Sequence, residues 1–193
     1  MNNESRDKWN NIYQDVSITA TSPTAVLKDN KYLLPKVGKA LDIACGAGAN
    51  AIFLARNGLE VEAIDVSDKV IDKLNEYANV QDLSINARVM DVMQSFPSDA
   101  LFDVVVVAHF LERELAEPII NCLKPGGLLF YQTFSQEVTE FYTGPRNPAF
   151  RLACNELLSL FSPLKIVVFR EEGLIGDLSK GFRNEAQLIA IKR

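Results

Sequence analysis

The stretch LDIACGAGAN, from Leu41 to Asn50, decides the fold. It is an apolar, strand-like run that contains one acid and closes on Gly46 and Gly48, which a single residue separates. With Ala51 these glycines match the loose pattern G-x-G-x-x-G/A, in which the backbone turns from a strand into a helix close to a nucleotide-like ligand. The stretch therefore predicts a ligand of that kind at the carboxyl end of a strand, without saying which one.

Further apolar runs follow at regular intervals and predict seven strands, at residues 40–45, 60–65, 85–90, 102–108, 128–134, 165–170 and 186–191. Helical periodicity fills the first two gaps, at 49–56 and at 68–78, with Ser67 as the expected N-cap of the second helix. Strands that alternate with helices predict an α/β fold, a doubly wound parallel sheet with helices on both faces.

Two details refine this sheet. The run VVVVA at 104–108 has no polar alternation, which is typical of a central strand covered on both faces. The last two expected strands are joined by EEGLIGDLSKGFRNE at 171–185, which is rich in Gly and lacks helical periodicity. This linker predicts an antiparallel pair at the end of the sheet.

Two short helical patterns precede the first strand. SRDKWNNIYQD at 5–15 has Ser5 as a candidate cap. SPTAVLKDNKYLLP at 22–35 has Ser22 as a candidate N-cap and Pro23 at the first helical position. We expect both helices to form a cap on the core rather than a separate domain.

Composition excludes several partners. The 20 basic and 25 acidic residues give a net charge of -5, and no Lys/Arg run offers a nucleic-acid surface. The longest apolar runs are too short to span a bilayer, and the first residues lack the apolar region of a signal peptide, so we expect a cytoplasmic protein with no membrane partner. The three cysteines, Cys45, Cys122 and Cys154, are widely spaced and predict neither a disulfide framework nor a metal site.

Two acids beside the glycine turn bear on the choice of ligand. Asp65 ends the second expected strand, 19 residues after Gly46 (65 minus 46), where a carboxylate that binds ribose is expected for several nucleotide ligands. Asp42 separates these ligands, because a carboxylate repels the pyrophosphate of a dinucleotide and attracts the sulfonium and ammonium of S-adenosylmethionine. Asp42 therefore favours S-adenosylmethionine over a nicotinamide cofactor.

Five segments now occur in a recognisable order: LDIACGAG, VEAIDVS, RVMDVMQSFP, FDVVVVAHFL and LKPGGLLFYQTF. In this order, over residues 39–134, the chain resembles the class I S-adenosylmethionine-dependent methyltransferases. The N-terminal helix with DKWNNIY and the run ALDIACGAGANAIFLARNG are similar to the tellurite-resistance and thiopurine-type members. The resemblance implies a Rossmann-like sheet of seven strands with an antiparallel last strand, and S-adenosylmethionine as cofactor. It also implies a small methyl acceptor, either a chalcogen or metalloid oxyanion such as tellurite or selenite, or a thiol.

The resemblance divides a single domain into three parts. Residues 1–38 form the helical cap, 39–134 the cofactor-binding core, and 135–193 the acceptor-side loop with the last strands. It also leaves the oligomeric state open.

Cofactor roles follow residue by residue from the same resemblance. Gly46 and Gly48 are expected to line the methionine and ribose portion, Asp42 to help hold the ammonium, Asp65 to accept the ribose hydroxyls and Asp91 to approach the adenine. The remaining expected neighbours of the cofactor are Cys45, Val66, Val92 and Ala108. The chain departs from the family at Ala44-Cys45, where many members carry a third glycine.

Trp9 and Tyr13 lie four residues apart and so share one helical face. They are expected to cover the cofactor, because aromatic faces attract a sulfonium, or else to fix the cap to the domain.

The acceptor side is less specific. His109, the only histidine, closes the fourth strand and is a candidate general base, or else a cap of the turn. The turn-rich segment after the fifth strand is typical of a functional lid, and its candidate acceptor residues are Tyr142, Arg146, Phe150 and Arg151. The arginines suit an anionic acceptor, whereas in a plain surface loop they would be solvated. A nicotinamide-dependent reductase and a non-catalytic cofactor-binding module stay open as alternatives.

Overall fold

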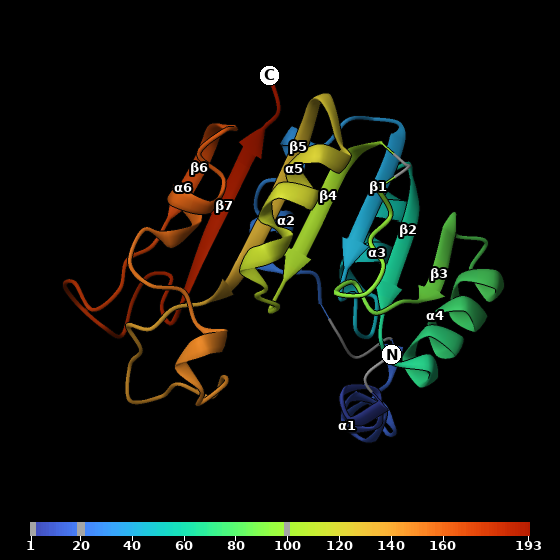
Figure 1. Ribbon diagram of the computed structural model, residues 1–193, viewed down its shortest axis with the longest axis horizontal. Coiled ribbons are helices and arrows are strands. Elements are labelled where there is room, and N and C mark those ends of the chain that lie inside the picture. Colours follow the sequence, from blue (N-terminus) through green and yellow to red (C-terminus); the bar gives the residue numbers. More distant parts are fainter. Residues whose placement is uncertain (1–2, 19–21, 99–100) are drawn as a thin grey trace.

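One mixed sheet runs through the molecule (Figure 1). The structure, a computed structural model, describes residues 3–18, 22–98 and 101–193. Its strands are β1 (Gly38–Ile43), β2 (Leu59–Asp65), β3 (Ile85–Val89), β4 (Phe102–Ala108), β5 (Leu123–Phe134), β6 (Lys165–Arg170) and β7 (Glu185–Ile191). Their order is β3-β2-β1-β4-β5-β7-β6, in which the first five strands are parallel and β7 runs antiparallel between β5 and β6. The predicted seven strands and the antiparallel end are confirmed.

Helices cover both faces of this sheet, as expected. They are α1 (Asn3–Tyr13), α2 (Ala25–Lys28), α3 (Ala49–Arg56), α4 (Asp68–Val80), α5 (Ala116–Cys122) and α6 (Glu156–Leu160), with short 3₁₀ turns η2 (Lys31–Leu33), η3 (Arg113–Leu115) and η4 (Pro148–Phe150). Buried residues of α2, α3 and α4 pack on one face, and those of α5 and α6 pack on the other.

The strand β4 shows why both faces are apolar. Val104 and Val106 join the core under α2, α3 and α4, while Val105 and Val107 join the core under α5 and α6. All four side chains are completely buried, because alternate residues of a strand point to opposite faces. The uninterrupted valine run therefore lies in the middle of the sheet, as its sequence predicts.

The helical cap differs from the prediction. The described part of α1 begins at Asn3, so Ser5 lies inside the first turn rather than at the cap. The helix expected over 22–35 is a single α-helical turn followed by η2, and its N-cap is Thr24 rather than Ser22.

Side chains that compete with the backbone explain the short α2. The Asn30 side-chain amide donates to the carbonyl of Val26 (3.0 Å), which a continuing helix would offer to the backbone N–H of residue 30. Thr24 is tied to α3 instead, through its N–H and hydroxyl on the Asn50 amide oxygen (2.9 and 3.1 Å).

The carboxyl ends of β1, β2 and β4 meet at one edge of the sheet, where α1 and the segment 135–151 project on either side (Figure 1). In a doubly wound sheet this edge is where ligands bind. No helix within the described ranges is long and apolar enough to cross a membrane.

Candidate functional site

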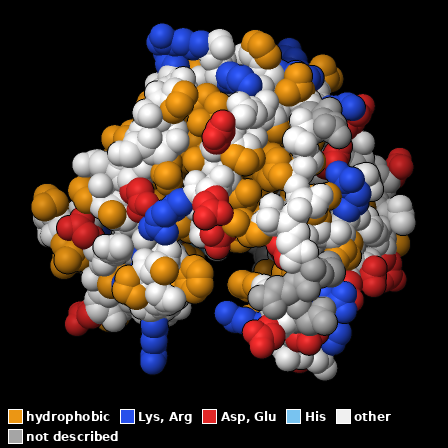
Figure 2. All heavy atoms as spheres, viewed as in Figure 1, with side chains coloured by type: hydrophobic (Ala, Val, Ile, Leu, Met, Phe, Trp, Pro, Cys, Tyr) orange, Lys and Arg blue, Asp and Glu red, His pale blue; other side chains and the backbone are white. Residues whose placement is uncertain are grey.

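A pocket of about 940 Å³ opens at this edge of the sheet. Its wall comes from α1, the turn after β1, the ends of β2, β3 and β4, and the segment 143–150. Figure 2 shows the molecule hollowed between the two projecting parts, seen from the side of α5 and α6. The volume is at the upper end of what small-molecule sites enclose, so it has room for a cofactor and a second small molecule.

The glycine turn forms the floor of the pocket. Gly46 and Gly48 both have positive φ, +50° and +75°, which glycine adopts without strain. A Cβ on Gly46 would lie 2.7 Å from the Tyr13 hydroxyl, and one on Gly48 would lie 2.5 Å from the Leu74 side chain. Gly46 lines the pocket, whereas Gly48 does not: it caps α3 and lets that helix begin tightly against α4.

Asp65 is fixed by the backbone around it. Its Oδ2 accepts the N–H of Gly46 and its Oδ1 accepts the N–H of Ser67, both at 2.9 Å. Burial raises the pKa of the Asp65 carboxyl, and the N–H groups of Ser67, Gly46 and Val66 oppose that shift. The carboxylate lines the pocket and has lone pairs left for a ligand's hydroxyl groups.

Asp42 lies within β1 and does not line the pocket. It is fully buried, and among the described residues neither carboxylate oxygen has a hydrogen-bond partner. Burial raises the pKa of Asp42 to about 8. The nearby Ala51 N–H, which falls short of hydrogen-bond geometry, opposes this rise, and the charge of Asp65 adds to it. A carboxyl of this kind is mostly protonated at neutral pH, so the negative charge that the sequence placed beside the turn is largely absent.

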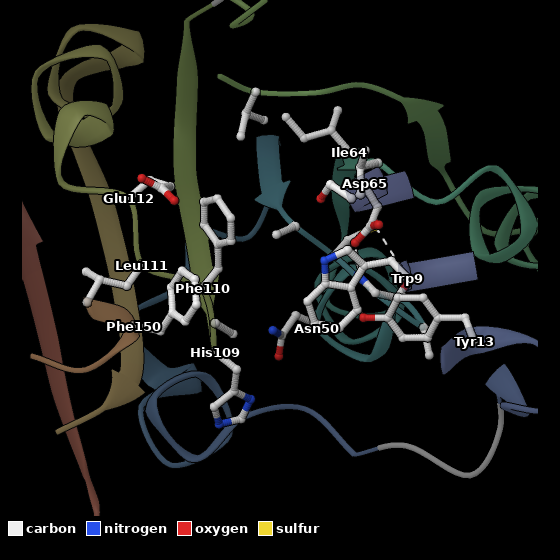
Figure 3. A pocket seen from close by; sticks show the side chains of 18 of the residues that line it. Trp9, Tyr13, Asn50, Ile64, Asp65, His109, Phe110, Leu111, Glu112 and Phe150 are labelled. Atoms are coloured by element: carbon white, nitrogen blue, oxygen red, sulfur yellow. Dashed lines mark hydrogen bonds between the residues drawn. The ribbon is translucent and has the colours of Figure 1, made fainter. Parts of the chain in front are cut away.

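Helix α1 closes one side of the pocket. Trp9 and Tyr13 both line it and stack on each other at 5.6 Å between ring centroids, with planes 20° apart. In Figure 3 both rings lie on the same side of the pocket as Asp65. The end of α1 is held by Lys73, whose ammonium donates to the carbonyls of Tyr13, Gln14 and Val16 at 3.0, 2.7 and 3.1 Å.

The end of β3 supplies another part of the wall. Asp91 and Val92 line the pocket, as do Val66 and Cys45. The Asp91 carboxylate accepts the backbone N–H of Met93 at 3.1 Å and the Gln94 side chain at 2.8 Å, which fixes its orientation.

The end of β4, with His109, lies across the pocket from Trp9, Tyr13 and Asp65 (Figure 3). Ala108 and His109 both line it, and His109 has φ +53° in the left-handed region. The imidazole stacks on Phe134 at 5.0 Å between centroids, and its Nε2 lies 3.1 Å from Oε1 of Glu185.

The predicted acceptor residues separate into two groups. Phe150 lines the pocket, but Tyr142, Arg146 and Arg151 do not. The Tyr142 ring packs edge-on against Phe134 and carries the Arg151 guanidinium at 5.7 Å from its centroid. Arg151 also donates to the Arg146 carbonyl at 3.4 Å. The structure therefore places the arginines in the loop behind the pocket rather than on its wall.

Many wall residues were not found from the sequence, among them Lys8, Asn50, Ile64, Phe110, Leu111, Glu112, Phe134, Thr143, Gly144 and Pro145. Phe134 and Glu112 had a usable signal, since both follow or end a predicted strand at the ligand edge. Glu185 had one too, because an antiparallel strand starts at the edge where its parallel neighbours end.

Comparisons with known proteins agree with this geometry. The chain is 28% identical over 137 residues to a ubiquinone biosynthesis O-methyltransferase of Coxiella burnetii (strain Dugway), a match that covers 68% of this chain and 58% of that protein. The chain thus spans little more than half the length of that relative. Among solved structures it is similar to TehB from Haemophilus influenzae, with a TM-score of 0.68, 23% identity, and 87% of this chain and 61% of the other covered. A TehB-like methyltransferase from Corynebacterium glutamicum aligns over 100% of both chains, with a TM-score of 0.68 and 16% identity.

The structural matches establish the methyltransferase fold. The family model described as tellurite resistance protein TehB matches residues 5–192, which include the helical cap, the glycine turn, the end of β4 and the antiparallel strands. Because this match extends over nearly the whole chain, the protein belongs to the TehB family.

Proposed function

We propose that the protein, acting as a single domain, transfers a methyl group from S-adenosylmethionine to a small soluble acceptor. The observation that carries the proposal is the Asp65 carboxylate, which the Gly46 N–H holds in place at the floor of the pocket. A carboxylate in this position accepts the two hydroxyls of a ribose.

The turn also favours S-adenosylmethionine over a nicotinamide dinucleotide. A dinucleotide site uses the free N–H groups of its glycine turn to bind pyrophosphate. Here the Gly46 N–H is already donated to Asp65, so a phosphate would meet a carboxylate instead of a donor. A cationic ligand has the opposite preference, since the carboxyl groups of Asp65 and Asp91 line the pocket.

Each side chain has a defined task in this proposal. Asp65 orients the ribose, Asp91 approaches the adenine, and the stacked rings of Trp9 and Tyr13 cover the cofactor and exclude water. S-adenosylmethionine supplies an already activated methyl group, so the protein contributes mainly proximity, alignment and a dry pocket.

For the acceptor we propose a small molecule whose nucleophile is a chalcogen atom, carried by a thiol, a hydroxyl or an oxyanion of the tellurite type. The family description supports tellurite chemistry, and the curated relative from Coxiella is named for O-methylation. Sulfur and oxygen acceptors differ in one requirement: a thiolate needs no base, whereas a hydroxyl has to lose its proton during transfer.

Calorimetric titration with S-adenosylmethionine, S-adenosylhomocysteine and NADH tests the proposal. We expect micromolar binding of the first two and none of NADH. Asp65→Ala should weaken S-adenosylhomocysteine about 100-fold, because two charge-assisted hydrogen bonds to the ribose are lost. Asp72→Ala, which removes an exposed acid of α4, is the matched control and should bind normally. Binding of NADH alone would support the reductase alternative, and normal affinity in Asp65→Ala would refute the site assignment.

A further inference from the structure

We propose that the acceptor half of the pocket takes an uncharged aromatic molecule bearing a hydroxyl or thiol, and that Glu185 positions His109 to receive its proton. This inference rests on the methyl transfer proposed above and selects the acceptor class for the same site.

The lining of this half is apolar. Around His109 it includes Phe110, Leu111, Phe134, Pro145 and Phe150, with Glu112, Thr143 and Gly144 as the adjoining polar or small residues. Figure 3 shows His109, Phe110, Leu111 and Phe150 on the side of the pocket opposite Trp9 and Tyr13. Aromatic rings in such surroundings gain both from burial and from edge or offset contacts with one another.

The charges on the wall disfavour an oxyanion. Three carboxylates line the pocket, those of Asp65, Asp91 and Glu112, and among its described lining residues the only Lys or Arg is Lys8. Lys8 itself lies over the Trp9 ring, 5.6 Å from its centroid, on the α1 side. A selenite or tellurite ion in the apolar half would have Glu112 nearby and no guanidinium to pair with.

Glu185 is held in one orientation by three elements. Its Oε1 faces His109 Nε2 at 3.1 Å, and its Oε2 accepts the side-chain amide of Gln132 at 2.6 Å. Gln132 is buried in β5, and its own amide oxygen accepts the N–H of Val26 in α2 at 2.7 Å. The carboxylate is therefore fixed before any ligand arrives.

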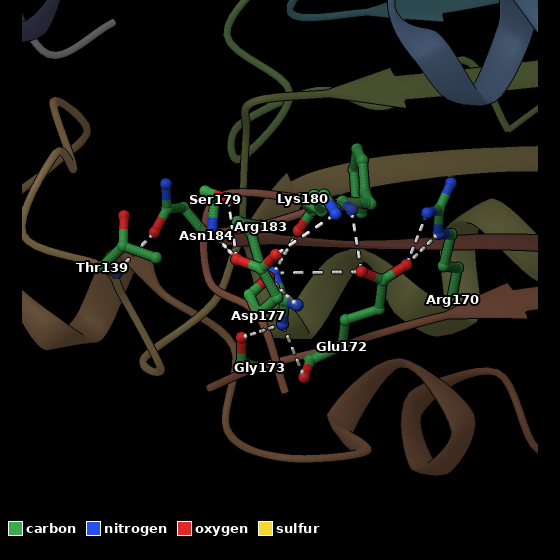
Figure 4. A network of polar contacts seen from close by, with 10 residues as sticks. Thr139, Arg170, Glu172, Gly173, Asp177, Ser179, Lys180, Arg183 and Asn184 are labelled. Carbon is green, nitrogen blue, oxygen red and sulfur yellow. Dashed lines mark hydrogen bonds and ion pairs between the residues drawn. The ribbon is translucent and has the colours of Figure 1, made fainter. Parts of the chain in front are cut away.

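The residues before Glu185 anchor the start of β7. The Asn184 side-chain oxygen accepts the N–H of Thr139 at 2.6 Å, which ties the acceptor-side loop to the strand. The Arg183 side chain donates to the carbonyls of Gly173, Asp177 and Lys180 at 2.9, 3.0 and 2.7 Å (Figure 4). Because β7 is antiparallel, its first residue reaches the edge where β4 ends, and Glu185 meets His109 there.

His109 is equally constrained. Its N–H donates to the Gln132 carbonyl at 2.9 Å, which holds the left-handed backbone, and its ring stacks on Phe134. A carboxylate at Nε2 favours the tautomer with the proton on that nitrogen. Nδ1 then carries the lone pair, and within the described residues it has no hydrogen-bond partner.

These groups account for every bond, electron pair and proton in the methyl transfer. The acceptor oxygen or sulfur forms a bond to the methyl carbon while the methyl–sulfonium bond breaks, and that bond's electron pair stays on the departing thioether sulfur. The acceptor's proton goes to Nδ1 of His109, and Glu185 stabilises the imidazolium that results. No further reactant is required.

Acceptors of different acidity test the role of His109. A phenol, with a pKa of about 10, keeps its proton at neutral pH, whereas thiophenol is largely ionised there and needs no base. His109→Gln should lower the turnover of phenol about 100-fold and that of thiophenol less than about 3-fold. Glu185→Gln should lower phenol turnover about 10-fold with little change in KM, and Glu185→Asp should recover part of the loss. Glu117→Gln, at an exposed position of α5, is the matched control.

A second readout does not depend on activity. His109 is the only histidine, so the imidazole of the tag-free protein gives one pair of ¹⁵N resonances. The wild type should show the tautomer protonated at Nε2, and Glu185→Gln should shift the two resonances toward each other. Affinity for S-adenosylhomocysteine should stay within about 2-fold in all variants, which shows that they are folded.

The outcomes separate the two proposals. Equal losses with phenol and thiophenol, or an unchanged tautomer in Glu185→Gln, would overturn the roles of His109 and Glu185. Methylation of selenite or tellurite but of neither aromatic acceptor would overturn the acceptor class and leave the proposed function standing. If the wild type binds neither S-adenosylmethionine nor S-adenosylhomocysteine, the proposed function fails, and this inference fails with it.

Discussion

Two residues at the ligand edge hold a backbone conformation that L-amino acids avoid. Ala44 and His109 both have φ +53°, and they follow or end the neighbouring strands β1 and β4. In both places the chain has to leave a buried strand sharply to pass under the pocket. A side chain in the left-handed region costs about 1–2 kcal/mol, which the packed sheet around it must offset.

Ala44 gives a direct test of that strain. Ala44→Gly should raise the free energy of unfolding by up to about 1 kcal/mol, because relief of the strain exceeds the added backbone entropy of glycine. Urea denaturation measures the change. Ala47→Gly in the same turn is the control: Ala47 has no positive φ, so the same exchange should destabilise the protein. If both variants lose stability, the backbone at Ala44 is not strained.

Asp42 makes stability depend on pH. Its pKa is raised by burial from the ordinary value of 3.8 to about 8 in the folded protein, so the folded state binds a proton that the unfolded state releases. The contribution of this proton to the free energy of unfolding is complete below about pH 4. It is lost as the pH rises toward 8, by ~1.4 kcal/mol per pH unit at most. Asp42→Asn keeps the shape without the charge, and its stability relative to the wild type should rise by ~2–4 kcal/mol between pH 5 and pH 8. Chemical denaturation at both pH values measures this, with Asp72→Asn as the control that should follow the wild type. A pH-independent difference would mean that Asp42 is ionised throughout.

At the scale of elements, side chains of α4 and its N-cap hold α1 in place. Helix α1 packs on α4, where Ser67 donates its hydroxyl to the Asn10 side chain at 2.6 Å and Lys73 binds the last carbonyls of α1. The same helix carries Trp9 and Tyr13, which line the pocket. Its attachment therefore controls how well the cofactor is covered.

Lys73→Met should release α1 while leaving the sheet intact. We expect the affinity for S-adenosylhomocysteine to fall roughly 10-fold, corresponding to ~1.4 kcal/mol, and limited proteolysis to cut within residues 3–18 faster. Lys69→Met, on an exposed position of the same helix, is the control and should resemble the wild type. Unchanged affinity together with faster cleavage would show that α1 does not cover the cofactor.

The elements that the sequence predicted well are those with local causes. The helix 49–56 is found with the expected bounds, and the Ser67 hydroxyl accepts the N–H of Val70 at 3.4 Å as its role of N-cap requires. The helix expected over 22–35 fails because the side chains of Asn30 and Asn50 take part in its hydrogen bonds, and the second of these lies 26 residues from Thr24.

The candidate site shows the same division. Gly46, Asp65 and Asp91 lie on the pocket wall where the motif series indicated. Glu185 was missed because it is 76 residues from His109; the antiparallel direction of its strand indicated the edge at which it lies, but not its partner. Arg146 and Arg151 had suitable chemistry, but neither lines the pocket, and the Arg151 guanidinium contacts Tyr142 and the Arg146 carbonyl in its own loop.

At the scale of the whole molecule, a central sheet carries two peripheral segments, α1 and 135–151, which form opposite walls of the pocket. β1, β4 and β5 have neighbours on both sides, whereas no described side chain of α1 is buried and most of the segment 135–151 is exposed. Regions with few buried contacts open first in the native state.

Hydrogen exchange followed by mass spectrometry should show this order. Without ligand, β1, β4 and β5 should exchange slowest, and α1 and 135–151 fastest. S-adenosylhomocysteine should slow exchange in α1 and at 44–48 and 64–66, and an aromatic acceptor added afterwards should slow 135–151. Slowing of 135–151 by S-adenosylhomocysteine alone would place the cofactor on the wrong side of the pocket.

The position of β7 between β5 and β6 has a consequence for synthesis on the ribosome. Translation produces β6 before β7, yet among the described strands β6 pairs only with β7. Until β7 emerges, the edge of β5 that faces away from β4 has no partner strand, and Leu129, Phe130 and Tyr131 lie along it. An open apolar edge of this kind can pair with the same edge of a neighbouring nascent chain. The sheet is complete only when residues 185–191 form β7 between β5 and β6. Because Glu185 is the first of these residues, a chain that stalls before it lacks the partner of His109 and leaves this apolar edge of β5 unpaired.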